Sequence, residues 1–252
     1  MSPAIELFAV PGLPVIEPGD DLALLIAERL DRPLQSGDVV VIAQKIVSKA
    51  ENRFVDLATV KPSPEAERLA AETGKAAAVV EVVLSESVRV VRSRPNLMIM
   101  QHRLGMVMAN AGVDHSNVAE TGAPDRLLLL PRDPDASAER LRTDLSSRLG
   151  VEIAVVISDS FGRAWRRGTV GVAIGAAGLP ALVDLRGTPD MFGRTLEVTV
   201  IGFADEIAAA AGLVMGQADE RQPVVVIRGL RWAMPAASAR ELIRPPAEDL
   251  FQ

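Results

Sequence analysis

Three short apolar runs constrain this fold more than any other feature of the sequence. VVVI at 39–42 is entirely β-branched, VEIAVVI occupies 151–157, and VVVI recurs at 224–227. Runs of this length and composition are typical of buried strands. Further strands are predicted at 88–93, 96–101, 180–187 and 195–203.

Helical segments lie between these runs. Segment 19–30 has acids in its first turn, 63–74 starts at Ser63 as N-cap and stops at Gly74, 133–150 closes at Gly150, and 204–216 is rich in alanine. The tail, 235–252, indicates a short helix bounded by prolines and packed on the outside. Several strands follow one another directly, so we expect an α/β (α+β) fold with mixed β-sheets and packed helices.

Composition narrows the class of protein. The chain has 252 residues, 48% of them hydrophobic, which suffices for one large domain over 1–252 or for two subdomains, without a fused second domain. No run is long enough to span a membrane, and the N-terminus lacks a basic leader region. The chain has no cysteine, a net charge of −6 and 3% aromatic residues. We therefore expect a cytoplasmic enzyme that binds neither nucleic acid nor membrane.

Two acidic loops are the candidate chemical centres. ANAGVDHSNV at 109–118 brings Asp114, Ser116 and Asn117 together, and ISDSFGR at 157–163 places Asp159 and Ser160 at the end of a strand. Hard oxygen ligands of this kind suit Mg²⁺ or Mn²⁺, although a lone loop aspartate is as often a turn or cap residue. Taken together, the two aspartates favour a metal site.

Basic residues surround the second loop. Arg163, Arg166 and Arg167 follow Asp159, and guanidinium groups pair well with carboxylate or phosphate, although Arg167 is interpreted as a solvated surface residue. Lys45 and Lys49 share one face if the chain is helical there, where a nucleotide phosphate is a reasonable partner for one of them. His102 and His115 are interpreted as structural.

Glycine-rich GVAIGAAG at 171–178 matches neither a P-loop nor a dinucleotide fingerprint. Close backbone packing is the favoured interpretation over phosphate binding. The residues alone therefore predict an enzyme that handles a phosphorylated or polyanionic small molecule with a divalent metal.

Seven ordered blocks between about residues 5 and 230 resemble the coenzyme F420:L-glutamate ligases, or gamma-glutamyl ligases. They are GLPVIEPGDDL, VVVIAQKIVSKAENR, RLGMVMANAGVDHSNV, LLPRDPDASAERLR, ISDSFGRAWRRGTVGVAIGAAGL, DLRGTPDMFGRTLEVT and ADEIAAAAGLVMGQADERQPVVVIRG. The resemblance implies the family's own mixed fold and the GTP-dependent addition of L-glutamate to a phospholactyl deazaflavin precursor. A second L-glutamate is then added to the γ-carboxylate of the first. It also implies a homodimer, with Mn²⁺ or Mg²⁺ as cation and K⁺ as a further candidate ion.

The resemblance assigns roles residue by residue. Metal ligands fall on Asp114, Asp159, Ser160 and Gln217, where Ser160 replaces the family's threonine. Nucleotide contacts fall on Leu13, Pro14, Val15, Ile16, Gln44, Lys49, Asn117, Met215, Gly216, Gln217, Ala218, Asp219, Glu220, Arg221 and Gln222.

The catalytic candidates are Asp114, Asp159, Arg163 and Arg166. The two arginines are included because of their charge alone, and they would hold glutamate carboxylates or the phosphodiester. Many relatives carry aspartate at Gly171, several carry an acid or lysine at Gln217, and some carry serine at Gln44. Two alternatives stay open: a non-catalytic nucleotide-binding paralogue, and a ligase of the same chemistry with another carboxylate acceptor.

Overall fold

A five-stranded sheet forms the centre of the protein. The computed structural model describes residues 4–116, 118 and 125–250. The strand order is β1-β12-β2-β8-β9. β2 and β8 run parallel, and the other neighbouring pairs are antiparallel, so the sheet is mixed, as the sequence predicts. The strands are β1 (Glu6–Ala9), β2 (Val39–Ala43), β8 (Ala154–Gly162), β9 (Thr169–Ala177) and β12 (Val224–Arg228).

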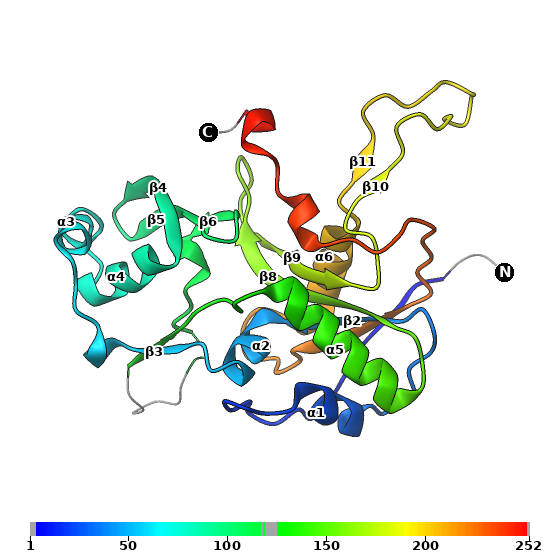
Figure 1. Ribbon diagram of the computed structural model, residues 1–252, viewed down its shortest axis with the longest axis horizontal. Coiled ribbons are helices and arrows are strands. Elements are labelled where there is room, and N and C mark those ends of the chain that lie inside the picture. The colour runs from blue at the N-terminus through cyan, green and yellow to red at the C-terminus, as the bar shows by residue number, and fades with distance from the viewer. Residues whose placement is uncertain (1–3, 117, 119–124, 251–252) are drawn as a thin grey trace.

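Both faces of this sheet are covered, which explains its continuous apolar strands. Along β2, Val40 and Ile42 pack into one core and Val39 and Val41 into another, because successive side chains point to opposite faces. One face is covered by α1 (Leu22–Arg29), α2 (Gln44–Ala50) and α5 (Pro134–Leu149), and the other by α6 (Phe203–Met215) (Figure 1).

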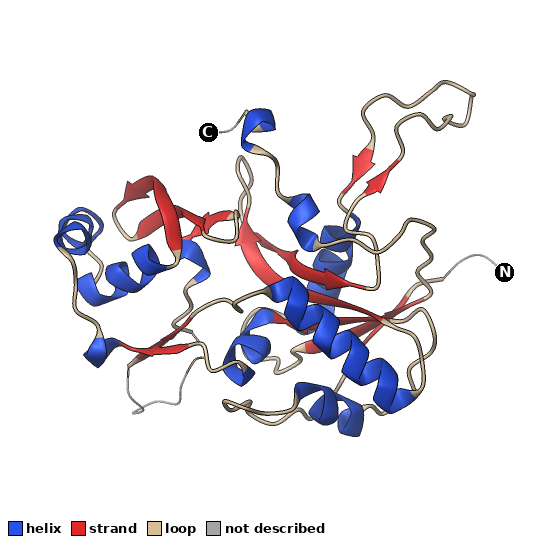
Figure 2. Ribbon diagram, viewed as in Figure 1, coloured by secondary structure: helices blue, strands red, loops and turns tan. Residues whose placement is uncertain are grey.

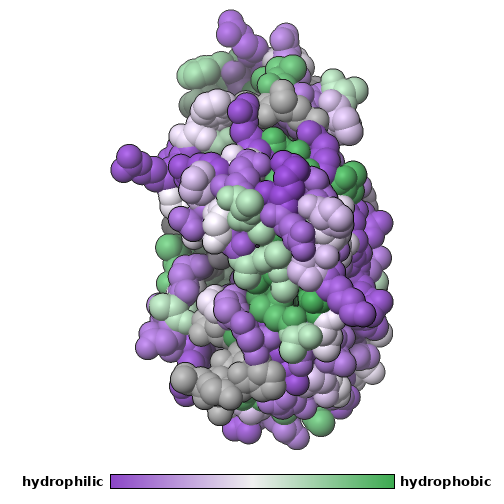
Figure 3. Space-filling view, turned by 90° about the vertical axis from the view of Figure 1, so that its left-hand side faces the viewer, coloured by the Kyte–Doolittle hydropathy of each residue, from purple (hydrophilic) through white to green (hydrophobic). Residues whose placement is uncertain are grey.

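A second lobe lies beside the central sheet (Figure 2). It holds a three-stranded antiparallel sheet and two helices with a core of their own around Leu69, Val83 and Met100. Viewed from that side, the surface is largely hydrophilic with a patch of hydrophobic residues near its middle (Figure 3). The elements are β3 (Phe54–Asp56), η1 (Leu57–Thr59), α3 (Pro64–Thr73), α4 (Ala77–Ser85), β4 (Ser87–Arg94), β5 (Leu97–His102), β6 (Val107–Ala109), η2 (Asn110–Gly112) and β7 (Arg126–Leu128), with β3 paired to β7.

Helix boundaries follow the capping residues in the sequence. Ser63 Oγ accepts from Ala66 N at the start of α3, and Gly74 and Gly150 end α3 and α5 with positive φ. The prediction for α1 was wrong in one respect. Its acids precede the helix, where Asp21 is the N-cap and accepts from Leu24 N, and its first turn holds no acidic residue.

Two segments differ from the predicted strands. The regions 180–187 and 195–203 form strands only at β10 (Val183–Asp184) and β11 (Val200–Ile201), with further backbone hydrogen bonds from Leu185 N to Thr199 O and from Gly187 N to Leu196 O. The chain between them forms an arm that projects from the body (Figure 1). The tail forms η3 (Ala239–Leu242) and η4 (Pro246–Glu248). In the part of the chain that the structure describes, no helix has the length and apolar character needed to cross a bilayer.

Candidate active site

Parallel pairing of β2 with β8 sets the position of the site. Ala43, the last residue of β2, pairs with Ser158 of β8, so Gln44 and Asp159 continue side by side from adjacent strands. Asp159 lies inside β8, which runs on to Gly162 paired with β9, and not at the end of a strand as the sequence suggested. β8 continues beyond its last residue paired with β2 because β9 still pairs with it on the other side.

Asp114 reaches the same place from the second lobe. Its backbone exchanges two 2.9 Å hydrogen bonds with Leu128, which fixes the loop after η2. Asn110, Ala111 and Gly112 have φ of 49°, 52° and 65°, three successive left-handed residues just before it. Such a conformation is unfavourable for alanine, whereas asparagine tolerates it, and at Ala111 it is held by the surrounding structure.

The first turn of α2 holds the carboxylate of Asp114. Gln44 Nε2 donates to Asp114 Oδ2 over 2.7 Å, and Ser48 Oγ donates to Gln44 Oε1 over 2.9 Å, which fixes the orientation of the amide. Lys45 Nζ lies 3.4 Å from Asp114 Oδ1 and 3.3 Å from Ser116 Oγ. Asn117 lies outside the described residues.

Burial and a neighbouring negative charge disfavour ionisation at this site. Burial, then the charge of Asp114, raises the pKa of Asp159 to about 7, against smaller opposing effects of the Ser160 N–H and Lys45. Burial also raises the pKa of Asp114, and Lys45 and Gln44 counteract it. One lysine does not balance two half-buried carboxylates, so the pair suits an additional cation.

The carboxylates of Asp114 and Asp159 fit a metal ion that also keeps ligands from outside the protein. Among the described residues there is no group of three or more His, Cys, Asp or Glu able to hold a metal. Two carboxylates, with phosphate oxygens and water, are a usual set for Mg²⁺. Ser160 lies on the opposite face of β8, with Ser158, whose Oγ is 3.9 Å from Met215 Sδ at the end of α6. Gln217 follows α6 and is exposed.

The segments that the resemblance assigns to the nucleotide adjoin α2 and β8. Gly19 N donates to Ala50 O over 2.9 Å, which ties the N-terminal loop to α2. In that loop Ile16 is buried, Leu13 packs on the core, and Pro14 and Val15 are exposed. Burial lowers the pKa of Lys49, and Glu17 opposes this effect.

The segment after α6 forms a turn whose backbone N–H groups face the Glu220 carboxylate. Gly216 ends α6 with φ of 71°, and Arg221 also has positive φ. The Glu220 carboxylate accepts from Ala218 N over 2.8 Å, and backbone N–H groups of Ala218, Glu220 and Gln217 lower its pKa. Asp219 and Gln222 lie in the same stretch, and Asp219 is exposed.

Arg163 and Arg166 lie in the hairpin between β8 and β9. Arg163 Nη2 donates to Arg167 O over 3.3 Å, and its Nε is buried without a hydrogen bond to any of the residues described. Arg166 is exposed, and Trp165 beside it is 88% exposed with φ of 64°. Both arginines therefore extend beyond Asp159 along the same hairpin, and neither contacts the carboxylate pair.

Gly171 is a packing residue. It pairs with Ser160 and is buried against α6, where a Cβ atom would lie 2.3 Å from Ala208 O. A Cβ on Gly175 would lie 2.4 Å from Pro134 O in the same way. The close-packing interpretation of GVAIGAAG is thus confirmed, and an aspartate side chain at 171 would not fit this arrangement.

Sequence reasoning missed two contributors to this site. Lys45, considered only for a phosphate, approaches Asp114, and Ser48 positions Gln44. The available signal was the four-residue spacing of Gln44 and Ser48 directly after a buried strand, which places both on one helix face. Both histidines are hydrogen-bonded: His102 accepts from Leu104 N over 2.9 Å, and His115 Nε2 lies 2.6 Å from Asp125 Oδ1. Their structural role stays a prediction.

Comparison with known proteins gives one consistent result. Residues 12–229 match the sequence model of a family described as F420-0:Gamma-glutamyl ligase. The chain is 46% identical over 254 residues to a coenzyme F420:L-glutamate ligase of Methanopyrus kandleri, covering 99% of this chain and 98% of that protein. Proteins with the same name from Methanothermobacter thermautotrophicus (46% identical; 98% and 99% covered) and Archaeoglobus fulgidus (45%; 98% and 96%) are similar.

Proposed function

The chain belongs to the F420-0:gamma-glutamyl ligase family, and we propose from this that it is a coenzyme F420:L-glutamate ligase. It joins L-glutamate through an amide bond to the carboxylate of a phospholactyl deazaflavin precursor, and then through a γ-link to the first glutamate. The observation that carries the proposal is the near-complete match to ligases of this name, together with the Asp114–Asp159 pair just beyond the parallel pairing of β2 with β8.

Amide formation at neutral pH needs an activated carboxylate. In the proposed reaction the γ-phosphoryl group of GTP passes to the acceptor carboxylate, and GDP leaves. The glutamate nitrogen then bonds to the acyl carbon, loses a proton, and inorganic phosphate leaves with the C–O electron pair. Catalysis of this kind consists mainly of positioning and charge neutralisation.

Each residue of the site has a defined part in this scheme. Asp114 and Asp159 would hold a divalent cation, which when bound neutralises charge on phosphate oxygens. Gln44 and Ser48 keep the Asp114 carboxylate in one orientation. Lys45 adds a positive charge 3.4 Å from that carboxylate. Lys49, less solvated than a surface lysine, is suited to a nucleotide phosphate.

Gly171 does not argue for a non-catalytic paralogue. Its contact with α6 explains the glycine by packing, independently of any ligand. The non-catalytic alternative and the alternative acceptor are therefore outcomes of the assay below and are not separate proposals.

We extend the proposal to a homodimer built with the β10–β11 arm. Met191, Phe192 and Val198 in the arm are 88%, 86% and 85% exposed, and large apolar side chains grouped on a projecting segment are typical of an interface. A light-scattering mass equal to one chain would overturn this part. Replacing Met191 and Phe192 by serine should convert a dimer to monomer.

Product mass decides the activity. The protein is incubated with GTP, Mn²⁺, L-glutamate and the phospholactyl deazaflavin, and we expect product heavier by one or more glutamyl groups. Asp159→Asn should remain folded and lose turnover, while Asp144→Asn, on the exposed side of α5, should keep it. Absence of glutamylated product from the folded wild-type protein, or equal turnover by Asp159→Asn, would refute the proposal.

A further inference from the structure

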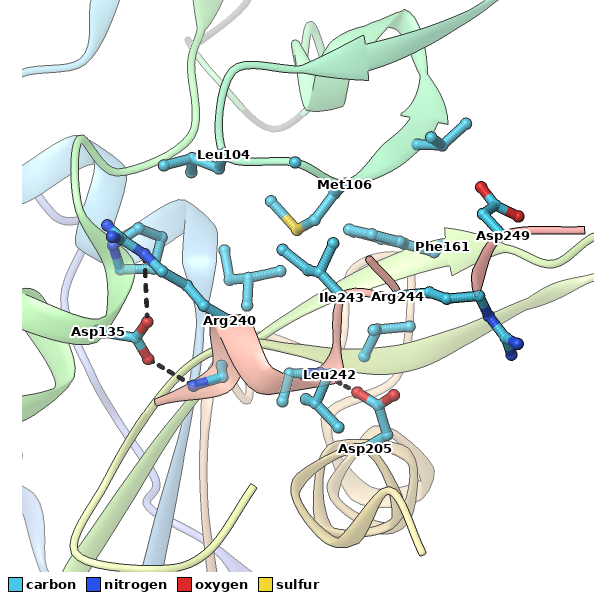
Figure 4. A pocket seen from close by; sticks show the side chains of 17 residues that line it. Leu104, Met106, Asp135, Phe161, Asp205, Arg240, Leu242, Ile243, Arg244 and Asp249 are labelled. Atoms are coloured by element: carbon cyan, nitrogen blue, oxygen red, sulfur yellow. Dashed lines mark hydrogen bonds and ion pairs between the residues drawn. The ribbon is translucent and has the colours of Figure 1, made fainter. Parts of the chain in front are cut away.

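A largely apolar cavity opens where the central sheet, the second lobe and the C-terminal segment meet (Figure 4). Its volume is about 260 Å³. Leu104 and Met106 line it from the turn between β5 and β6, Phe161 from β8, and Leu242 and Ile243 from the end of the chain. None of these residues takes part in the carboxylate site or the nucleotide segments described above.

The C-terminal wall of the cavity is fixed by Asp135 at the start of α5. Its Oδ1 accepts from Ala176 N over 2.9 Å and from Ala239 N over 2.8 Å, and its Oδ2 accepts from Ser238 Oγ over 2.6 Å. One carboxylate thus joins α5, β9 and η3. A Cβ at Gly105 would lie 3.2 Å from Ile243 Cδ1, so the wall meets the β5–β6 turn closely at that point.

The opposite wall is held by the buried His102. Its Nδ1 accepts from Leu104 N over 2.9 Å, which shapes the turn that carries Leu104 and Met106 into the cavity. Both walls are therefore built before any ligand arrives, as is usual for sites that bind small molecules.

The cavity lies next to the proposed reaction centre. Phe161 is two residues beyond Asp159 on the same face of β8, about 7 Å along the strand. Val107 lines the cavity at the start of β6, and the chain passes from there through η2 to Asp114. A ligand with one end in the cavity thus has a short path to the carboxylate pair.

Size and chemistry favour an aromatic ring. The volume is slightly below the range of about 300–1,000 Å³ for complete small-molecule sites, so it suits one flat ring system. Eight of the 17 lining residues are Leu, Ile, Val, Met or Phe, and Phe161 offers an aromatic surface. The lining also holds five charged residues, Asp135, Asp205, Arg240, Arg244 and Asp249. Arg244 stands at the exposed rim, where a guanidinium can pair with a phosphodiester.

We propose that this cavity binds the deazaflavin ring of the acceptor, with Phe161 and Ile243 as its specificity-determining contacts and Arg244 toward the phosphodiester of the tail. This inference rests on the proposed function. The wall at 239–249 lies beyond residue 229, where the match to the family model ends.

Binding is tested with the deazaflavin riboside, which has the ring but lacks the phospholactyl tail. Ring fluorescence is titrated with wild-type protein, Ile243→Trp, which fills the cavity, and Phe161→Leu, which removes the aromatic surface. Leu213→Trp, at an 87% exposed position on α6, is the matched control. We expect the dissociation constant to rise about tenfold or more for the two cavity variants and to be unchanged for the control.

Steady-state kinetics show whether the cavity binds the deazaflavin acceptor or glutamate. Ile243→Trp should raise KM for the phospholactyl deazaflavin about tenfold while KM for glutamate and GTP stays constant. A rise in KM for glutamate alone would assign the cavity to the amino acid and overturn the inference, as would an active wild-type enzyme that does not bind the riboside. The wild-type protein could bind the riboside, and lose that binding in Ile243→Trp, yet have no ligase activity. This result would support ring binding in the cavity and refute the proposed function. Circular dichroism and thermal unfolding of both variants control for folding.

Discussion

Burial and the negative charge of Asp114 together raise the pKa of Asp159 to about 7, although the two carboxylates come from different parts of the fold. Asp159 belongs to the central sheet, whereas Asp114 follows β6 of the second lobe and is paired with Leu128. A ligand that neutralises both carboxylates would therefore join the two lobes as well as serve the chemistry.

Divalent cation should stabilise the folded protein through this pair. A cation that binds only the native state at about 100 times its dissociation constant adds about 2.7 kcal/mol. For a chain of this size we expect Mn²⁺ or Mg²⁺ to raise Tm by several degrees relative to a chelator. Asp159→Asn should abolish the increase and Asp144→Asn should retain it, as measured by differential scanning fluorimetry. An equal increase in Asp159→Asn would place the cation elsewhere.

Ser48 should act on activity through Gln44. Ser48→Ala removes the 2.9 Å hydrogen bond that orients the Gln44 amide, at a cost of about 1 kcal/mol in the free energy of unfolding. With the amide able to turn over, Asp114 loses a constant donor, and kcat/KM should fall several-fold. Ser48→Thr, which keeps the hydroxyl, should restore most of the activity. A loss of stability without loss of kcat/KM would show that Ser48 has only a structural role.

Gly171 should tolerate no side chain. Gly171→Ala places a Cβ 2.3 Å from Ala208 O, so α6 or β9 must shift, and we expect the free energy of unfolding to fall by about 1–3 kcal/mol or more. Gly162→Ala on the adjoining strand meets no atom within 4 Å and is the matched control, expected to change stability by less than about 0.5 kcal/mol. Urea unfolding of the two variants gives the comparison.

Acid should weaken the interactions of Glu86 with His102, Arg103 and Arg53. Burial raises the pKa of Glu86, but His102, Arg103 and Arg53 outweigh it and hold the pKa at about 2, below the usual 4.5. Its stabilising contribution is complete above about pH 4.5 and is lost as the pH falls toward 2, which corresponds to about 3 kcal/mol. Glu86→Gln should flatten this part of the pH profile of urea unfolding, whereas Glu28→Gln, on the exposed face of α1, should leave it unchanged.

The elements that sequence reasoning predicted well are those with a local cause. β2 is a run of β-branched residues, α3 begins at a serine cap and ends at a glycine, and α5 ends at Gly150. β9 escaped prediction because its small residues match α6 and α5 across the sheet, which is a tertiary requirement. The meeting of Asp114 with Asp159 likewise depends on the β2–β8 pairing and on Leu128, and no local pattern encodes either contact.

The turn after α6 should bind nucleotide more tightly when Glu220 is removed. The Glu220 carboxylate already accepts from the backbone N–H of Ala218 and lies against Gly216, in a segment that the resemblance assigns to the nucleotide. Backbone N–H groups arranged in this way bind anions, so the carboxylate occupies a position that suits a phosphate oxygen. Glu220→Ala should lower the dissociation constant of GTP several-fold in calorimetry, because no internal anion has to leave first. Asp219→Ala removes the same charge from the exposed neighbour and is expected to have a smaller effect. If both variants change the affinity equally, general charge repulsion accounts for the effect, and if Glu220→Ala weakens binding, the carboxylate is needed to hold the turn in shape.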